Sequence, residues 1–169
     1  SGSITHNDDF ILIQPAVAKI MEKYPQTELH IAGILDIPKE LEAFKERVIA
    51  HPFADWKKLP EMIVSMDINL APLEESIFNE AKSENKWVEA ALVRVPTIAS
   101  NLGAFKRMIE HNKTGILANT CDEWYEGLES LVVDAQKRQY IAKNAYEYCK
   151  VRCVTLYTGF QLMKFIKSR

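Results

Sequence analysis

The sequence predicts an α/β fold in which one doubly wound, parallel sheet is covered by helices on both faces. Short apolar segments alternate with segments of helical periodicity almost without exception along the 169 residues, a pattern typical of parallel strands joined by helices. The short segments are apolar throughout, as expected for strands buried on both faces. A closed eight-stranded barrel needs about 250 residues. We therefore expect a single domain over residues 1–169 with an open sheet.

The amino-terminal half of the chain contains the first three expected helices. The first helix is predicted over residues 9–24, where apolar side chains recur at helical spacing, with Asn7 or Asp8 as its N-cap and Pro25 soon after its end. The next segments are each apolar or begin near a proline, which favours a helix start. They are predicted as the strand 27–35, a short helix from Pro38 to about residue 44, the strand 47–53, the helix 59–66 and the strand 67–73.

The carboxyl-terminal half continues the alternation after a polar loop. Apolar residues at helical or strand spacing define each element. The predicted order is a helix at 83–93, a strand at 96–100, a helix at 104–112, a strand at 114–118, helices at 121–134 and 136–150, and a last amphipathic segment at 154–169.

Composition excludes several classes of protein. A net charge of −2 and a pI of about 6.1 do not suggest a nucleic-acid surface. No apolar run approaches the roughly 18 residues of a membrane span. The three cysteines are an odd number without framework spacing, which predicts reduced thiols in the cytoplasm. Cys149 and Cys153 would share a helix face, but no second pair or nearby histidine completes a metal site, so no metal is expected.

Polar clusters follow three predicted strand positions, where ligands bind in doubly wound sheets. In the loop 2–9, small residues precede a helix N-terminus, and Thr5 and His6 could add donors for a phosphate. The same loop also fits a capped turn that binds nothing. In the loop 51–60, Trp56 could cover a nucleotide base or serve as a packing anchor.

The third cluster is the charged stretch 82–89. Ser83 or Asn79 is expected to cap the helix 83–93, with Glu84 in its first turn. Lys86 and Glu89 are three residues apart and fit a plain surface pair. However, apolar residues follow Glu89 at once, which predicts a carboxylate at a buried helix edge that needs partners. A vicinal diol is a natural partner, and Lys82 and Lys86 would then face the negative part of the same ligand.

This region resembles a known family. The segment "EAALVRVPTIASNLGAFKRMIEHNKTGILA" (89–118) is similar to the carboxyl-terminal half of GT-B glycosyltransferases, particularly those of family 4, the group 1 type. "DINLAPL" (67–73) resembles the strand before that motif. "FNEAKSENKWVEAALVRVPTIAS" (78–100) and "GSITHNDDFILIQPAV" (2–17) resemble a bacterial surface-polysaccharide subset. The resemblance covers nearly the whole chain.

The resemblance implies a Rossmann-like domain, one half of a GT-B fold, that binds a nucleotide-diphosphate sugar as substrate without a metal. By this analogy Glu89 would hold the ribose hydroxyls, and the base would lie near residues 53 to 56, including Trp56. The remaining implied contacts are Ser3, Thr5 and His6 against the diphosphate, and Lys82, Ser83, Glu84 and Lys86 near the sugar and phosphates.

The sequence departs from the family pattern at two places. The family has two glutamates separated by seven residues, but Ala81 stands where the glutamate before Glu89 is expected. The Arg and Lys that neutralise the diphosphate in the first loop are also absent, with Ser3 and Asp8 near those positions. Lys82 or Lys86 could substitute for them.

A GT-B enzyme also needs an amino-terminal acceptor domain. We therefore expect the chain to be a fragment of a longer hexosyltransferase that builds a polysaccharide or glycolipid, and to be catalytically silent alone. A degenerate structural or regulatory module and half of a nucleotide-sugar epimerase remain alternatives. Dinucleotide oxidoreductases and P-loop ATPases are disfavoured because G-x-G-x-x-G and G-x-x-x-x-G-K-[ST] are absent. A cytoplasmic location is expected. The segment 154–169 could touch the inner membrane surface or pack on its own or the missing domain.

Overall fold

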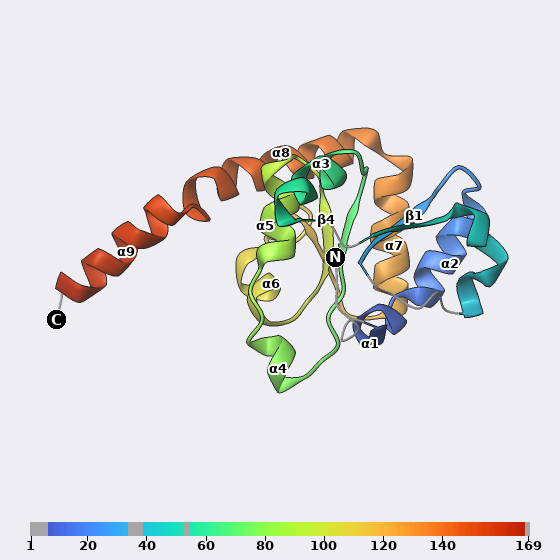
Figure 1. The fold of residues 1–169 in the computed structure, drawn as a ribbon, viewed down its shortest axis with the longest axis horizontal. Helices are drawn as coiled ribbons and strands as arrows, with labels where there is room; N and C mark the ends of the chain where they lie inside the picture. The colour runs from blue at the N-terminus through green and yellow to red at the C-terminus, as the bar shows by residue number, and fades with distance from the viewer. Residues whose placement is uncertain (1–6, 34–38, 53–54, 168–169) are drawn as a thin grey trace.

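A computed structural model describes residues 7–33, 39–52 and 55–167 of the chain (Figure 1). Helices and strands alternate through most of this length, as the sequence predicts. The elements are α1 Asn7–Ile11, α2 Gln14–Lys23, β1 Leu29–Ala32, the 3-10 helix η2 Lys39–Arg47, β2 Val48–His51, the 3-10 helix η3 Trp56–Lys58, α3 Leu59–Val64, β3 Asn69–Ala71, α4 Ile77–Glu80, α5 Asn85–Leu92, β4 Thr97–Ser100, α6 Gly103–Met108, β5 Ile116–Ala118, α7 Cys121–Val133, α8 Ala135–Arg152 and α9 Thr155–Lys167.

All strand pairs are parallel, but the described strands form two sheets rather than one. β1 pairs with β2, with Leu29 opposite Val48. The second sheet has the order β3-β4-β5, with Leu70 opposite Ile98 and Ile98 opposite Ile116. No pairing joins β1 to β3 among the described residues. The parallel α/β architecture is thus as predicted, while the single continuous sheet is not.

Helices cover both faces of the second sheet. Ile98 and Ile116 pack with α2 and α7 in a core that includes Trp124. Ala99, the next residue of β4, faces the opposite side with Trp87 of α5. This alternation follows from the two-residue period of a strand, and it explains why β4 is buried at every position. The fold class predicted from the sequence is confirmed.

The first helix is interrupted. The sequence predicts one helix over 9–24, but the structure has α1 and α2, with Pro15 at the start of α2. Proline has no N–H and its ring would clash with the carbonyl of Ile11, so a continuous helix is disfavoured there. The predicted stop at Pro25 is confirmed, because α2 ends at Lys23.

Two other local expectations differ from the structure. The polar loop before α5 contains the short helix α4, whose N-cap Ser76 accepts a hydrogen bond from the Asn79 N–H. The N-cap of α5 is Glu84, without a side-chain cap bond, and not Ser83 or Asn79. Asn79 is already inside α4 and buried, which removes it from the capping position.

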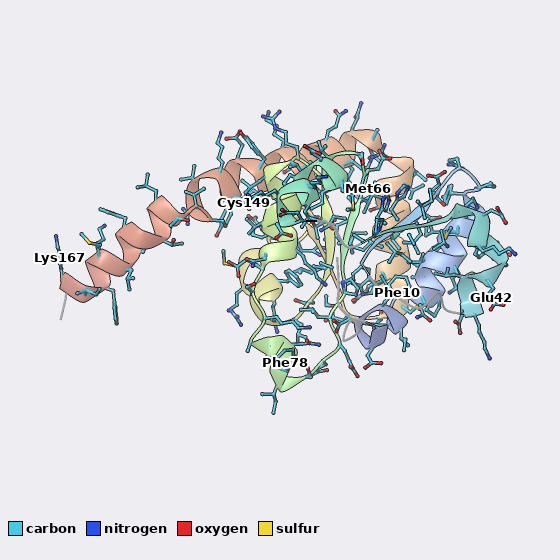
Figure 2. All side chains as sticks on the ribbon, viewed as in Figure 1. Phe10, Glu42, Met66, Phe78, Cys149 and Lys167 are labelled. Atoms are coloured by element: carbon cyan, nitrogen blue, oxygen red, sulfur yellow. The ribbon has the colours of Figure 1, made fainter. Side chains whose placement is uncertain are left out.

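The last helix does not pack on the domain. α9 leaves the body of the molecule as an isolated rod, and its side chains, including Lys167, point into the surroundings (Figures 1 and 2). No described residue of α9 is buried. The alternative that this segment packs on its own domain is therefore wrong. Within the described part of the chain, every helix is too short or too polar to span a membrane.

Candidate functional site

A cavity of about 560 Å³ lies between the two sheets. One wall is β1 and the opposite wall is β3, while α2 and α7 close one side and α3 closes another. Its volume is within the range of about 300–1,000 Å³ that ligand pockets occupy. The residues that matter below are Asp9, Leu29, His30, Ala32, Met62, Ile68, Leu70, Lys86 and Glu89.

Helix α5 brings two charged side chains to this cavity. The buried side of the helix is held in place, because the Trp87 indole donates a hydrogen bond to the Thr114 carbonyl at 2.8 Å. The start of the helix is held as well, since the Asn69 side-chain amide donates a hydrogen bond to the Lys86 carbonyl at 3.1 Å. With Trp87, Ala90 and Ala91 buried, the helical period places Lys86 and Glu89 together on the side that faces the cavity.

Both charged groups on this wall have shifted pKa values. Burial lowers the pKa of the half-buried Lys86 below its ordinary value, and the charges of Asp9 and Glu89 oppose that shift. Desolvation at the cavity wall raises the pKa of Glu89, and Lys86 opposes it. In each case desolvation disfavours the charged form. The half-buried Lys86 ammonium is therefore less solvated than on an open surface, which suits an anionic ligand.

The environment of Glu89 differs from the predicted one in one respect. The sequence predicts a carboxylate at a buried helix edge, but the Glu89 side chain is exposed. The buried stripe of α5 is formed by Trp87, Ala90 and Ala91, and Glu89 lies beside that stripe. Burial alone therefore does not require a partner for this carboxylate.

A second polar cluster borders the same cavity. Asp9 is only 2% exposed, and its Oδ1 accepts hydrogen bonds from the Glu74 N–H at 2.8 Å and the Asn79 side-chain amide at 3.0 Å. Lys82 Nζ lies 3.4 Å from Asp9 Oδ2. A buried carboxylate is stabilised by such partners. This cluster fixes the loop after β3 against α1 and holds Lys82 in place.

The residues predicted from the sequence are only partly brought together. Lys86 and Glu89 line the cavity, and Lys82 stands beside Asp9 at its border. Ser83 and Glu84 are not among the lining residues; the charge of Glu84 instead acts on Cys149 and Cys153, whose thiol pKa values are raised mainly by burial. The remaining predicted site residues lie outside what the structure describes. Ser3, Thr5 and His6 precede the described residues, and for Trp56 only the backbone is described.

Sequence reasoning missed Asp9 and Asn79. The only signal was an acidic residue in the first turn of a predicted helix, which usually marks a favourable helix-dipole contact. The pattern gives no hint that this carboxylate would accept bonds from residues 65 and 70 positions away. Among the described residues, no three His, Cys, Asp or Glu side chains gather as metal ligands.

Known proteins share this fold. The sequence profile described as "Glycosyl transferases group 1" matches residues 1–134. No curated protein matches the chain by sequence. Among solved structures, the C-terminal domain of a glycosyl transferase group 1 family protein, LpcC from Francisella tularensis, has 21% identity and a TM-score of 0.66, covering 89% of this chain and 80% of that one.

Two longer proteins are also similar. Anabaena HepE, solved in complex with UDP-glucose, has 22% identity and a TM-score of 0.74 and covers 100% of this chain. WaaG, a glycosyltransferase involved in lipopolysaccharide biosynthesis, has 18% identity and a TM-score of 0.70 and covers 93%. The match spans 47% of the HepE chain and 42% of the WaaG chain, so this chain is less than half as long as these two proteins.

Proposed function

The chain belongs to the glycosyl transferases group 1 family, and from this premise we propose that it is the donor-binding domain of a glycosyltransferase. The enzyme would move a sugar from a nucleotide-diphosphate sugar to a polysaccharide or glycolipid acceptor. The observation that carries the proposal is the pairing of Lys86 and Glu89 on one turn of α5 at the wall of the cavity. HepE, a protein of the same fold, has been crystallised with UDP and with UDP-glucose.

The chemistry of the two side chains fits the two halves of such a donor. A ribose diol can donate two hydrogen bonds to the Glu89 carboxylate, and the diphosphate offers negative charge to Lys86, with Lys82 nearby. Charge-assisted hydrogen bonds contribute about 1.5–3 kcal/mol each. Because burial lowers the pKa of Lys86, a bound diphosphate would favour its charged form and return part of the lost solvation.

We also propose that residues 1–169 are one domain of a longer, two-domain enzyme. The second domain would supply the acceptor site and further active-site groups, so the chain alone binds the donor but transfers no sugar. The proposed partner is the nucleotide sugar, with no resident metal and no nucleic acid. We place the enzyme in the cytoplasm, with α9 as the element that would meet the other domain or the inner membrane surface.

The first prediction concerns donor binding. Calorimetric titration with UDP, GDP and their sugar conjugates should give binding to one nucleotide series. Glu89→Gln should weaken that binding about ten-fold or more, the effect of losing one charge-assisted hydrogen bond. The matched control is Glu61→Gln on α3, an exposed carboxylate that does not line the cavity. This control should bind as the unchanged protein does.

The titration is best performed on both the chain and the longer enzyme. Binding that is equally strong in Glu89→Gln and Glu61→Gln would contradict the assigned role of Glu89. Absence of binding in the longer enzyme would favour a degenerate module. For the cations, Lys86→Ala should lower turnover of the longer enzyme, whereas Lys106→Ala, an exposed lysine on α6, should not.

A further inference from the structure

Helix α4 presents two large apolar side chains to solvent at the edge of the molecule where the strands end. Ile77 is 94% exposed and Phe78 is 73% exposed. The helix protrudes at the lower edge of Figure 1, and Phe78 lies on it in Figure 2. Because α4 follows β3 in the chain, it lies beyond the carboxyl end of that strand, where doubly wound domains bind ligands.

We propose that Ile77 and Phe78 form a platform for one sugar ring of the acceptor. This domain would thereby contribute one wall of the acceptor site, next to the donor. The proposal rests on the proposed function, because only a transferase that uses a sugar acceptor needs such a wall.

Polar contacts hold the platform in place. Before α4, the Leu73 N–H donates a hydrogen bond to Ser100 Oγ at the end of β4 at 2.8 Å. Within α4, the side-chain amide of the buried Asn79 donates to Asp9 Oδ1 at 3.0 Å. Apolar side chains on a mobile loop can turn inward, but those on a helix that is fixed in this way stay in water. Since removing apolar surface from water is favourable, a ligand that covers these two side chains gains affinity.

Lys82 connects the platform to the proposed donor site. Lys82 Nζ lies 5.2 Å from the centre of the Phe78 ring and 3.4 Å from Oδ2 of Asp9, which lines the cavity proposed for the donor. Ile77 and Phe78 do not line that cavity, so the platform is a separate, neighbouring site. The proposed function places the donor diphosphate near Lys82, and the diphosphate is bonded to the sugar that is transferred. A sugar ring on Phe78 would therefore lie beside the reacting end of the donor.

The chemistry of this surface suits a neutral sugar. The face of an aromatic ring carries partial negative charge, so it attracts the C–H groups on one face of a pyranose ring. The same segment carries three exposed carboxylates, those of Glu74, Glu75 and Glu80, and carboxylate oxygens accept hydrogen bonds from hydroxyl groups. An aromatic and aliphatic surface with a few polar groups beside it is typical of ligand sites.

The carboxylates also argue against a lipid surface as the occupant of the platform. Anionic membrane surfaces attract clusters of lysine and arginine, whereas all charged residues in the segment 74–80 are glutamates. The other surface that could cover α4 is the second domain of the longer enzyme. Packing of that domain on α4 would leave no room for a sugar ring, so measurements on the longer enzyme distinguish the two.

The test is an NMR titration of the chain with the methyl glycosides of glucose, galactose, mannose and N-acetylglucosamine, without nucleotide. At least one of these pyranosides should shift the resonances of the Ile77 methyl groups and the Phe78 ring. The dissociation constant should be in the millimolar range, because a single sugar ring has few atoms with which to gain affinity.

Variants of Phe78 show whether the aromatic face binds the sugar. Phe78→Ala and Phe78→Leu should each weaken the binding about ten-fold, because leucine restores apolar surface but not the aromatic face. Phe78→Tyr should bind within about two-fold of the unchanged protein, since tyrosine keeps that face. The matched control is Tyr140→Ala, which removes an exposed aromatic ring of α8 that does not line the cavity. This control should bind as the unchanged protein does.

The outcomes separate this proposal from its alternatives. It is overturned if none of the four pyranosides shifts the Ile77 and Phe78 resonances at about 100 mM, or if Phe78→Ala or Phe78→Leu binds as tightly as Tyr140→Ala. It is overturned as well if, in the longer enzyme without sugar, the Ile77 methyl groups are shielded from a soluble gadolinium chelate, because the second domain then covers α4. The pyranosides contain neither base nor phosphate, so a failure of the donor-binding titration would not produce any of these results.

Discussion

At the scale of single residues, one carboxylate connects helices α2 and α7. Glu129 Oε1 of α7 accepts hydrogen bonds from Lys23 Nζ at 2.7 Å, Tyr24 Oη at 2.9 Å and Tyr125 Oη at 2.7 Å. Lys23 and Tyr24 belong to the end of α2, so the cluster holds α2 against α7 at the border of the core. These three partners favour the charged form of Glu129.

The second prediction is the pH dependence of this cluster. The hydrogen bond from Lys23, followed by those from Tyr125 and Tyr24, lowers the pKa of Glu129 from 4.5 to about 2. A carboxylate whose folded pKa is depressed stabilises the fold above its unfolded pKa, and that contribution is lost as the pH falls. The unchanged protein should therefore lose urea resistance between about pH 4.5 and pH 2, and Glu129→Gln should lose less over that window.

The control is Glu126→Gln, an exposed carboxylate on the same helix. It should follow the unchanged protein across the whole range. High salt should reduce the difference between Glu129→Gln and the unchanged protein, because exposed charge pairs are screened. Equal pH profiles for Glu129→Gln and the unchanged protein would show that the cluster contributes nothing to stability.

The site residues show which contacts a sequence can predict. Lys86 and Glu89 could be placed together because three residues along a helix make neighbours, whatever the rest of the fold does. Asp9 could not be paired with Glu74 and Asn79, because the chain returns to Asp9 only after 65 and 70 residues. Local periodicity carries no information on such tertiary hydrogen bonds.

At the scale of elements, α4 and α6 meet through a glycine. Gly103, the first residue of α6, has φ of +53°, and a Cβ there would lie 3.0 Å from the Glu80 carbonyl oxygen and 3.2 Å from that of Asn79. The contact positions the end of α4 and thereby Asn79, the partner of Asp9. A residue other than glycine is strained in this backbone region and also crowds the carbonyls.

The third prediction compares two glycines. Gly103→Ala should lower the free energy of unfolding by about 1–3 kcal/mol, the cost of a strained left-handed residue. Gly159→Ala is the matched control, since nothing lies within 4 Å of its Cβ position in α9. Alanine should raise the helicity of α9 there and leave unfolding of the domain unchanged. Urea unfolding and far-UV circular dichroism check both, and equal stability of the two variants would contradict the packing role of Gly103.

The bounds of a helix could be predicted from the sequence where the signal lies in neighbouring residues. The helices 121–134 and 136–150 correspond closely to α7 and α8, because each has its own cap, Thr120 and Asp134. The apolar spacing of the first helix continues through Pro15 and so predicts a continuous helix, whereas the missing N–H of the proline divides it. α4 escapes prediction because a four-residue helix has too little periodicity to stand out from a polar loop.

At the scale of the whole molecule, the alternation of helices and strands predicts the doubly wound class but not the division of the described strands into two sheets. The order of elements in the chain determines that strands are parallel and covered by helices. Among the described residues β1 and β3 are not paired, and both line the cavity. The cavity volume of about 560 Å³ is within the range that ligand pockets occupy, as the proposed nucleotide-sugar site requires.

The terminal helix gives the last prediction. α9 exposes Leu156, Phe160, Met163 and Ile166, and no residue of it is buried. Deleting residues 155–169 should therefore leave the free energy of unfolding unchanged. Because an exposed apolar surface promotes association, the deletion should also lower self-association in sedimentation velocity. The intact chain should co-sediment with anionic vesicles only if the charges of Lys164 and Lys167 strengthen the binding of α9 to the lipid surface. A deletion that destabilises the domain would show that α9 packs on it after all.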